Sequence, residues 1–534
     1  MTQQVTQSNF GIVDGFVLVG YLAVLAAIGA YFSRRQSNLD EYFRAGQSMG
    51  WLPVGLSLMA ALNSGADYMT QPSAAIRYGL VYVPSLLTWV LAYFYVTRFI
   101  LPFYRRLNIF SVYQYLERRF DLRVRSLGAA IFILWRVSWM GTALYVPCLA
   151  LHAASGERIP LIPTIVLLGA VVTTYTALGG IQAVVWTDVI QFCVMILGLA
   201  VTVGIIVYNV EGGFANIWTT AHARGLTSIS WAFPGFDQPG MTNKISAILN
   251  CPPTAISIFA AILISRIGAF TSDQMTVQRF QTAKSIKDER PAFMVTALGD
   301  VIWMLGLAFV GLALFAYYQQ QPLPPGVTND GMLPHFMSTV LPIGVTGLVI
   351  AAIMAASLSS VDSAINSSTT VAVVDFCNRL YLGRDVAAVT LSEQEERQQV
   401  RLSRIITFTI GAIGTLVACN LSTIGDLVTI GIAVVGSFAG PLLAIYLLGI
   451  LTQRARSTAV LIGGIVGTIV TVYVAYFTEM KMWPATFGVL TTLVLGYVLS
   501  FVFPAGEEDA RLTHRALVQR GAVAVADRIG ATVS

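Results

Sequence analysis

Three apolar segments of this sequence contain polar residues, and the densest polar group consists of oxygen donors. It contains Ser359, Ser360, Asp362 and Ser363. A serine in a helix commonly bonds back to the preceding turn, but this explains isolated serines better than two adjacent hydroxyls beside a carboxylate. Oxygen ligands without nitrogen or sulfur donors favour a hard cation. We therefore predict that this segment binds a cation.

The other two interrupted segments are Asn63–Asp67 and Ser265–Asp273. Asn, Ser and Gly weaken a helix and leave backbone carbonyl groups free to bind a ligand, although a tolerated kink against neighbouring helices is the simpler alternative. A carboxylate such as Asp67 is costly deep in a membrane unless it has a partner. Both segments therefore predict discontinuous helices beside a binding site.

The composition indicates which elements position these residues. The chain has 534 residues, of which 56% are hydrophobic and 11% charged, and its mean hydropathy is +0.71. Soluble domains carry about 25% charged residues, so most of this chain is expected inside a lipid bilayer. The same numbers exclude a disordered or nucleic-acid-binding chain. The five dispersed cysteines argue against a disulfide framework or a metal site.

A membrane-spanning helix needs about 20 mostly apolar residues, and we predict an all-α polytopic membrane protein with about thirteen of them. The expected spans are Val13–Phe32, Trp51–Thr70, Val81–Leu101, Leu127–Leu151, Ile162–Leu178, Val184–Tyr208, Ala255–Gln274, Phe293–Tyr318, Leu341–Val374, Ile405–Leu421, Ile424–Leu451, Val460–Phe477 and Trp483–Val502. The interrupted helices are the second and the seventh, which is the spacing of transporters built from two inverted repeats. Five plus five spans then form a core, with one helix before it and two after.

The spans and charged loops also predict how the chain is divided and oriented. We expect the first helix and a cytoplasmic loop in 1–50, the ten-helix transport core in 51–451, two additional helices in 452–503 and a cytoplasmic tail in 504–534. With the N-terminus outside, 25 of the 32 Lys and Arg residues, Arg279 among them, lie on the inward side and 5 on the outward side. Because positively charged loops stay in the cytoplasm, we predict an external N-terminus and a cytoplasmic C-terminus.

The segment Gly179–Gln191, GGIQAVVWTDVIQ, resembles the signature of the sodium:solute symporter family. Further matches lie at Ser57–Asp67, Asp273–Arg279 and Ala355–Ser368, so the resemblance covers about residues 10–505. The family includes sodium-coupled carriers of sugars, proline, sialic acid, iodide and monocarboxylates. Its fold is the LeuT-type inverted repeat of five plus five helices, which the resemblance implies here.

In this family one sodium site joins the first and eighth helices of the core. The resemblance implies that its ligands here are the backbone oxygens of Ala60, Asn63 and Ala356 and the hydroxyl groups of Ser359 and Ser360. A neutral cage of this kind has modest affinity, as a carrier that must release its ion requires.

Some family members hold a second sodium ion between an aspartate and the serine-rich helix. The matching positions here are Asp188, Ser359, Asp362 and Ser363. Asp362 departs from the pattern, because members with two sodium ions usually have a serine there. The extra carboxylate could strengthen a second cation site or carry a proton, which leaves the stoichiometry open. Asp188 could alternatively cap the short loop before its own helix.

The solute site of this fold lies between the two broken helices. Asp67 and Arg266 match positions of sugar-contacting residues in the sodium–sugar branch. Phe270 and Gln274 lie one and two helical turns after Arg266 and are expected to line the same cavity. Arg136 lies about ten residues into the fourth span, which is about 15 Å at a rise of about 1.5 Å per residue. Either Arg266 forms an internal salt bridge with Asp67, or Arg266 or Arg136 holds an anionic group, most simply a carboxylate.

We therefore predict a sodium-coupled symporter that imports a small polar organic solute by alternating access, with a carboxylate as one candidate class of solute. Proton coupling in the same fold is the alternative, and a transporter-like sensor or channel is a different class. An enzyme is disfavoured, because the four histidines lie near no nucleophile and no phosphate-binding loop is present. We expect Na⁺ as the coupling ion without an organic cofactor, and a small-molecule substrate and membrane lipid as partners, with no nucleic acid and no obligate protein partner. The expected location is a bacterial plasma membrane.

Overall fold

The computed structural model describes residues 9–33, 36, 38–107, 109–385, 391–421, 427–504 and 512–513. Every regular element within these ranges is a helix, which confirms the predicted all-α class. Most of the predicted tail, 504–534, lies outside the described residues.

The helices fall on either side of a long connection after residue 223. Those before it are α1 (Ile12–Ser33), α2 (Leu39–Arg44), η1 (Ala45–Gln47), α3 (Trp51–Leu62), α4 (Gly65–Tyr78), η2 (Val83–Leu87), α5 (Thr88–Tyr95), η3 (Val96–Ile100), α6 (Leu101–Leu107), α7 (Gln114–Arg119), α8 (Leu122–Ala154), α9 (Leu161–Asn209) and α10 (Gly213–Ala223). Those after it are α11 (Met241–Leu249), α12 (Ala255–Ser272), α13 (Gln274–Gln281), α14 (Ile286–Gln320), η4 (Asn329–Gly331), α15 (Met332–Thr339), α16 (Val345–Val371), η5 (Ala372–Tyr381), α17 (Glu393–Asn420), α18 (Leu427–Leu451), α19 (Ser457–Phe477) and α20 (Pro484–Leu499).

Within the described ranges, nine helical segments are long and apolar enough to cross a membrane. The thirteen expected spans are divided differently in the structure. The second is split into α3 and α4, the seventh stops at the break between α12 and α13, and the fifth and sixth are joined in α9. The breaks thus lie where polar residues interrupt the apolar sequence, and the number of thirteen spans stays a prediction.

The break in α9 reverses the direction of the chain. Gly180 has φ 58° and ψ −160°, in the left-handed region that favours glycine. The side chains of Tyr175 and Thr187, on either side of it, both reach the carboxylate of Asp362. Residues twelve apart in a straight helix would be separated by about 18 Å along its axis, so both contacts require the two halves of α9 to lie side by side.

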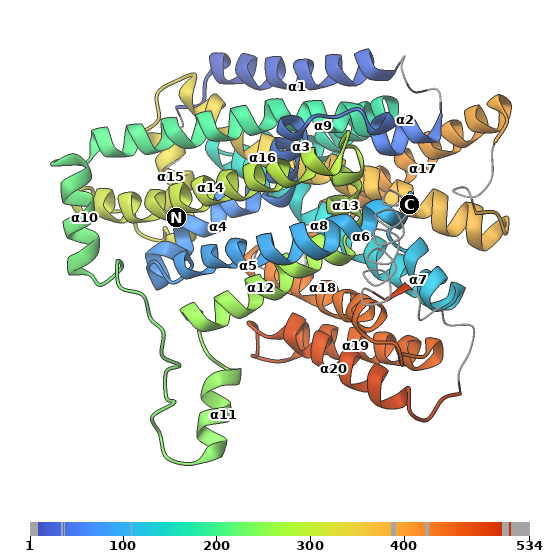
Figure 1. Cartoon of the computed structure of the whole chain (residues 1–534). Coiled ribbons are helices and arrows are strands. Elements are labelled where there is room, and N and C mark those ends of the chain that lie inside the picture. Colours follow the sequence, from blue (N-terminus) through green and yellow to red (C-terminus); the bar gives the residue numbers. More distant parts are fainter. Residues whose placement is uncertain are drawn as a thin grey trace, which may run out of the picture.

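The helix α16 is the centre of the bundle. Each residue from Val349 to Val371 is buried, although eight of these positions between 357 and 369 are Ser, Asp or Asn. α16 packs against α8, α9, α3 and α4. In Figure 1, α1 runs along one edge of the molecule, and α19 and α20 along the opposite edge. Polar residues on α16 are therefore enclosed by protein on every side.

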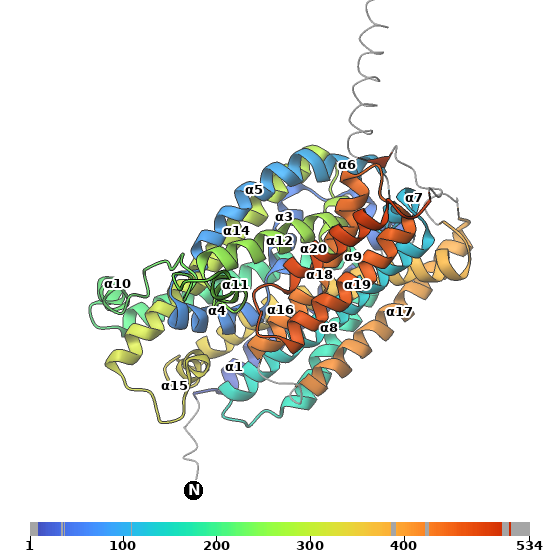
Figure 2. The ribbon, with the colours of Figure 1, turned by 90° about the horizontal axis from the view of Figure 1, so that it is seen from below.

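The connecting helices are gathered at two opposite ends of the bundle. Figures 1 and 2 both place α10 and α15 at one end and α7 at the other. α10 and α11 belong to the predicted outward loop, and α7 to a predicted inward loop. The two sets of loops are therefore separated along the bundle in the way that the predicted topology requires.

Candidate cation and solute sites

The break between α3 and α4 exposes backbone groups inside the bundle. Asn63 and Ser64 have extended backbones between the two helices. Ser64 caps α4, because its hydroxyl accepts a hydrogen bond from Ala66 N at 3.2 Å while Asp67 Oδ2 accepts one from Ser64 N at 2.7 Å. Since α3 has ended, the carbonyl groups of its last turn have no partner within the helix and are free to bind elsewhere.

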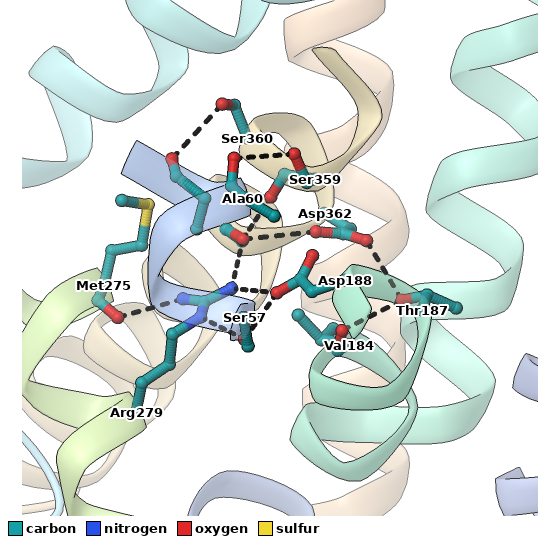
Figure 3. Close-up of polar contacts among 12 residues, drawn as sticks. Ser57, Ala60, Val184, Thr187, Asp188, Met275, Arg279, Ser359, Ser360 and Asp362 are labelled. Carbon is teal, nitrogen blue, oxygen red and sulfur yellow. Dashed lines mark hydrogen bonds and ion pairs between the residues drawn. The ribbon is translucent and has the colours of Figure 1, made fainter. Parts of the chain in front are cut away.

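Two serines of α16 face these carbonyl groups, as Figure 3 shows. The Ser359 hydroxyl lies 2.9 Å from both Ala60 O and Ala356 O. The Ser360 hydroxyl lies 2.9 Å from Asn63 O and 3.2 Å from Ala61 O. The structure therefore brings together the five residues predicted to bind sodium and adds the carbonyl oxygen of Ala61.

This group consists of neutral oxygen atoms only. Each hydroxyl donates its proton to a carbonyl and can turn to present a lone pair, since a serine is both donor and acceptor. Carbonyl and hydroxyl oxygens are ligands for hard cations. The donor set therefore fits Na⁺, and binding there would draw the break of the first core helix toward α16.

Next to this group lies a buried ion pair between Asp188 of α9 and Arg279 of α13 (Figure 3). Asp188 Oδ2 lies 2.9 Å from Arg279 Nη2 and accepts a hydrogen bond from the Ser57 hydroxyl at 2.6 Å. Both side chains are 1% exposed or less. The prediction that Arg279 is one of the inward loop charges is therefore wrong, because its guanidinium pairs with Asp188 inside the bundle.

Asp362 lies beside this ion pair (Figure 3), and its carboxylate accepts from hydroxyl groups of the described residues. The hydroxyl groups of Tyr175 and Thr187 lie 2.9 Å and 3.5 Å from Oδ2, and that of Ser363 lies 3.2 Å from Oδ1. The Ser363 hydroxyl also contacts Arg279 Nη2. Arg279 therefore pairs directly with Asp188 and is linked to Asp362 through the Ser363 hydroxyl.

Four residues of this region were not predicted: Ser57, Tyr175, Thr187 and Arg279. All but Tyr175 fall inside the motif segments quoted above, which was the available signal. Their partners lie more than 80 positions away in the sequence, apart from the bonds within one helix. The motif segments alone do not show which of their residues meet.

The second break places Asp273 between α12 and α13. Its carboxylate caps α13, accepting hydrogen bonds from Met275 N at 3.0 Å and from the Thr276 hydroxyl at 3.3 Å. It also pairs with Arg136 of α8, and both side chains are buried. The Arg136 guanidinium lies 4.3 Å from the Trp135 ring. Arg136, predicted to lie deep in its span, therefore reaches the break of the second discontinuous helix.

Of the two alternatives for Arg266, the salt bridge with Asp67 is wrong. Arg266 Nη2 lies 2.9 Å from Asp300 Oδ2, and its guanidinium lies over the Trp89 ring at 3.9 Å. Trp89 Nε1 donates to the same carboxylate oxygen at 2.6 Å. Asp67 is held instead by its local cap. The sequence does not reveal the pairing of Arg266 with Asp300, because Asp300 lies in α14, 34 positions away, and nothing in the sequence distinguishes it from other carboxylates at similar separations.

Phe270 and Gln274 lie in different surroundings from those expected. Both ends of the Gln274 amide bind the loop before α7, with Oε1 2.8 Å from Val112 N and Nε2 2.9 Å from Phe110 O. Phe270 lines a cavity of about 110 Å³ together with Phe280. Gln274 therefore fastens a loop, whereas Phe270 borders an open space beside the second break.

Comparison with known proteins places this geometry in a family. The sequence model of the sodium:solute symporter family matches residues 42–467. The sodium/sialic acid symporter of Proteus mirabilis (strain HI4320) is 30% identical, over 94% of this chain and 97% of that protein. The sodium-dependent multivitamin transporter of Oryctolagus cuniculus is 31% identical, over 88% of this chain and 71% of that protein.

Solved structures agree in fold. The substrate-bound, outward-open structure of a Na⁺-coupled sialic acid symporter matches with a TM-score of 0.82 and 30% identity, covering 94% of this chain and 100% of that one. A nucleobase-cation-symport-1 transporter matches with a TM-score of 0.53 at 15% identity, covering 89% and 98%, which shows the fold alone. The family consists of transporters rather than enzymes, and its relatives use Na⁺ as the coupling ion. This chain is a membrane protein of the sodium:solute symporter family.

Proposed function

We propose that this protein is a sodium-coupled symporter that carries a small organic carboxylate into the cell. Membership of the family supports sodium coupling. The observation that carries the choice of solute is Arg136, whose Nε is buried and has no hydrogen-bond partner among the described residues. A guanidinium with a spare donor beside a broken helix fits a carboxylate through its planar fork.

The proposed sodium ligands are the carbonyl oxygens of Ala60, Asn63 and Ala356 and the hydroxyl groups of Ser359 and Ser360. The hydrogen bonds between the two helices support this choice, because the same atoms already converge. Sodium would hold the first broken helix against α16 and so order the neighbouring solute site. This is the coupling that a symporter requires, since each ligand must favour the state that the other binds.

The solute is proposed to lie between the two breaks, with Arg136 holding its carboxylate and Phe270 forming an apolar wall. Arg266, Asp67 and Gln274 would support this site through their own contacts with Asp300, Ser64 and the loop before α7. The names of the relatives agree with an acid, since they include sialic acid and monocarboxylate transporters. An anionic solute is therefore the substrate class that we propose.

A second coupling site is proposed at Asp188, Asp362 and Ser363. Arg279 contacts Asp188 directly and is linked to Asp362 only through the Ser363 hydroxyl, so two buried carboxylates lie beside one guanidinium. One negative charge is then in excess, and an unpaired buried charge is costly. A second Na⁺ or a proton would balance it. Asp362→Ser removes the excess charge, so we expect the measured number of cations carried per solute to fall by one. An unchanged ratio, with uptake intact, would remove this site from the mechanism.

The proposed function is tested by uptake of radiolabelled sialic acid and lactate into proteoliposomes, with an inward sodium gradient, an inward proton gradient, or neither. We expect accumulation of an acid that requires the sodium gradient and that Arg136→Gln abolishes. The control is Arg123→Gln, since Arg123 is an exposed arginine of the same helix whose partner is Asp121. Uptake driven by the proton gradient alone, or unaffected by Arg136→Gln, would contradict the proposal.

A further inference from the structure

The ion pair between Arg136 and Asp273 ties a continuous helix to the break of a discontinuous one. Arg136 belongs to α8, and Asp273 is the residue between α12 and α13. The two side chains are 6% and 0% exposed. Salt screens a buried ion pair of this kind only weakly. The pair therefore holds α8 to the break between α12 and α13.

Arg136 is only partly satisfied by this pair. Its Nη2 contacts Asp273, while its Nε has no partner among the described residues. The large majority of buried side-chain polar atoms in proteins have a hydrogen-bond partner. The Nε–H group is therefore available to an acceptor outside the described residues, such as a bound solute. Nε together with one Nη can bind a carboxylate through two parallel hydrogen bonds.

Asp273 has hydrogen-bond donors besides Arg136, whereas the Nε of Arg136 has no acceptor among the described residues. Without Arg136 its carboxylate would keep the hydrogen bonds from Met275 N and the Thr276 hydroxyl. It would also stay at the N-terminus of the eight-residue helix α13, where the helix dipole favours a negative charge. Separating the pair therefore leaves Asp273 stabilised but Arg136 in need of a new anion.

We propose that Asp273 acts as an internal competitor for the solute: its carboxylate holds Arg136 in the empty carrier, and the carboxylate of the solute replaces it there. This proposal rests on the proposed function, because it requires an anionic solute at Arg136. A neutral solute cannot make the exchange without leaving the guanidinium unpaired. Asp273 thereby sets selectivity for anions, and the exchange frees the second broken helix from α8 when solute binds.

Asp273→Asn tests this exchange directly. Asparagine caps a helix about as well as aspartate, so the variant removes the negative charge while it keeps the cap of α13. The matched control is Asp121→Asn, since Asp121 caps α8 by accepting from Val124 N at 2.9 Å and pairs with Arg123 outside the site. Asp273→Ser, which also caps, replaces the first variant if that variant is not monodisperse.

Binding is measured by calorimetry at saturating Na⁺, with sialic acid and its methyl ester and with lactate and lactamide. We expect Asp273→Asn to lower the Kd of the acid that binds by about tenfold, because a competing state is removed. The Kd of the neutral analogue should change less than twofold, and Asp121→Asn should change neither.

The outcomes separate the two proposals. Binding of an acid that Arg136→Gln abolishes, together with an unchanged or weaker affinity in Asp273→Asn, would overturn the exchange alone. Binding that survives Arg136→Gln, or no binding of either acid to the wild-type protein, would overturn the proposed function and the exchange with it.

Discussion

At the scale of single residues, Ser360 connects the two halves of the proposed sodium site. Its hydroxyl bridges to two carbonyl groups of the first break, so Ser360→Ala removes a ligand and leaves those carbonyls without a donor. We expect the sodium concentration for half-maximal uptake to rise by about tenfold, which is the effect of about 1.4 kcal/mol. The measurement is uptake into proteoliposomes over a range of sodium concentrations.

The control for this variant lies two turns along the same helix. The Ser367 hydroxyl donates to Ser363 O at 2.7 Å and Ala364 O at 3.3 Å, both within α16. Ser367→Ala should therefore change the sodium dependence less than twofold. Equal effects of the two substitutions would mean that hydroxyl loss acts through the stability of α16 and that Ser360 is not a ligand.

The sequence marks the two segments that meet at the proposed sodium site, and the family resemblance supplies the proposed ligands, whereas the ion pairs around them could not be predicted. Hydroxyl groups and residues that weaken helices stand out in an apolar segment, so a single stretch of sequence is enough to reveal them. The partner of a buried charge depends on distant segments: Arg279 meets Asp188, 91 positions away, and Arg136 meets Asp273, 137 away. A charge near the end of an apolar segment therefore resembles a loop residue until its partner is known, as happened with Arg279.

At the scale of elements, α1 holds the beginning of α16. Asp14 Oδ1 accepts hydrogen bonds from Gly344 N at 2.8 Å and Gly347 N at 2.6 Å. A Cβ at residue 347 would lie 2.6 Å from the Asp14 backbone, so the two helices touch there. Although α1 precedes the proposed core, it caps the helix that carries both serines of the proposed sodium site.

Asp14→Ala removes these hydrogen bonds and should therefore destabilise the N-terminus of α16. Loss of an N-cap costs about 1 kcal/mol, and we expect a lower melting temperature in detergent together with a weaker sodium response. The control is Ser33→Ala at the opposite end of α1, because the Ser33 hydroxyl donates only to Ala30 O in its own helix and is exposed. An unchanged melting temperature in Asp14→Ala would show that α16 begins independently of α1.

Helix boundaries were the least predictable feature at this scale. The positions of both breaks follow from polar residues in apolar runs, so the sequence indicates them. The reversal at Gly180 was expected as a loop over residues 178–184, but one glycine with positive φ suffices, because glycine alone adopts that conformation at little cost. Composition cannot distinguish a short loop from a single-residue turn.

At the scale of the whole molecule, a charged network joins α7, α8 and η5 at one end of the bundle. Glu117 accepts hydrogen bonds at 2.7 Å from Arg125 and from Arg379. Burial disfavours the ionised Glu117, but the two arginines outweigh it and hold the pKa of this carboxyl below its usual range.

The lowered pKa predicts how stability depends on pH. A carboxyl with a depressed pKa in the folded state contributes stability above its unfolded value, about 4.3 for glutamate, and loses it as the pH falls through the folded value. Glu117→Gln should therefore melt at a lower temperature than wild type at pH 6 and approach it below about pH 4. The control is Glu393→Gln, since Glu393 forms an exposed pair 3.7 Å from Arg397, and its melting temperature should match that of wild type at every pH. A difference in melting temperature between Glu117→Gln and wild type that stays constant with pH would contradict the prediction.

The same charged end is predicted to face the cytoplasm, because 25 basic residues were assigned to that side of the predicted topology against 5 to the other, and without the buried Arg279 the inward side still holds 24. Thr219 of α10 and Gln394 of α17 are exposed at the two sides, so single cysteines there report orientation in a variant without the five native cysteines. A membrane-impermeant maleimide added to intact cells should label Thr219→Cys and leave Gln394→Cys unlabelled, while permeabilised cells should show both. The opposite pattern would reverse the topology and turn the proposed importer's external solute site toward the cytoplasm.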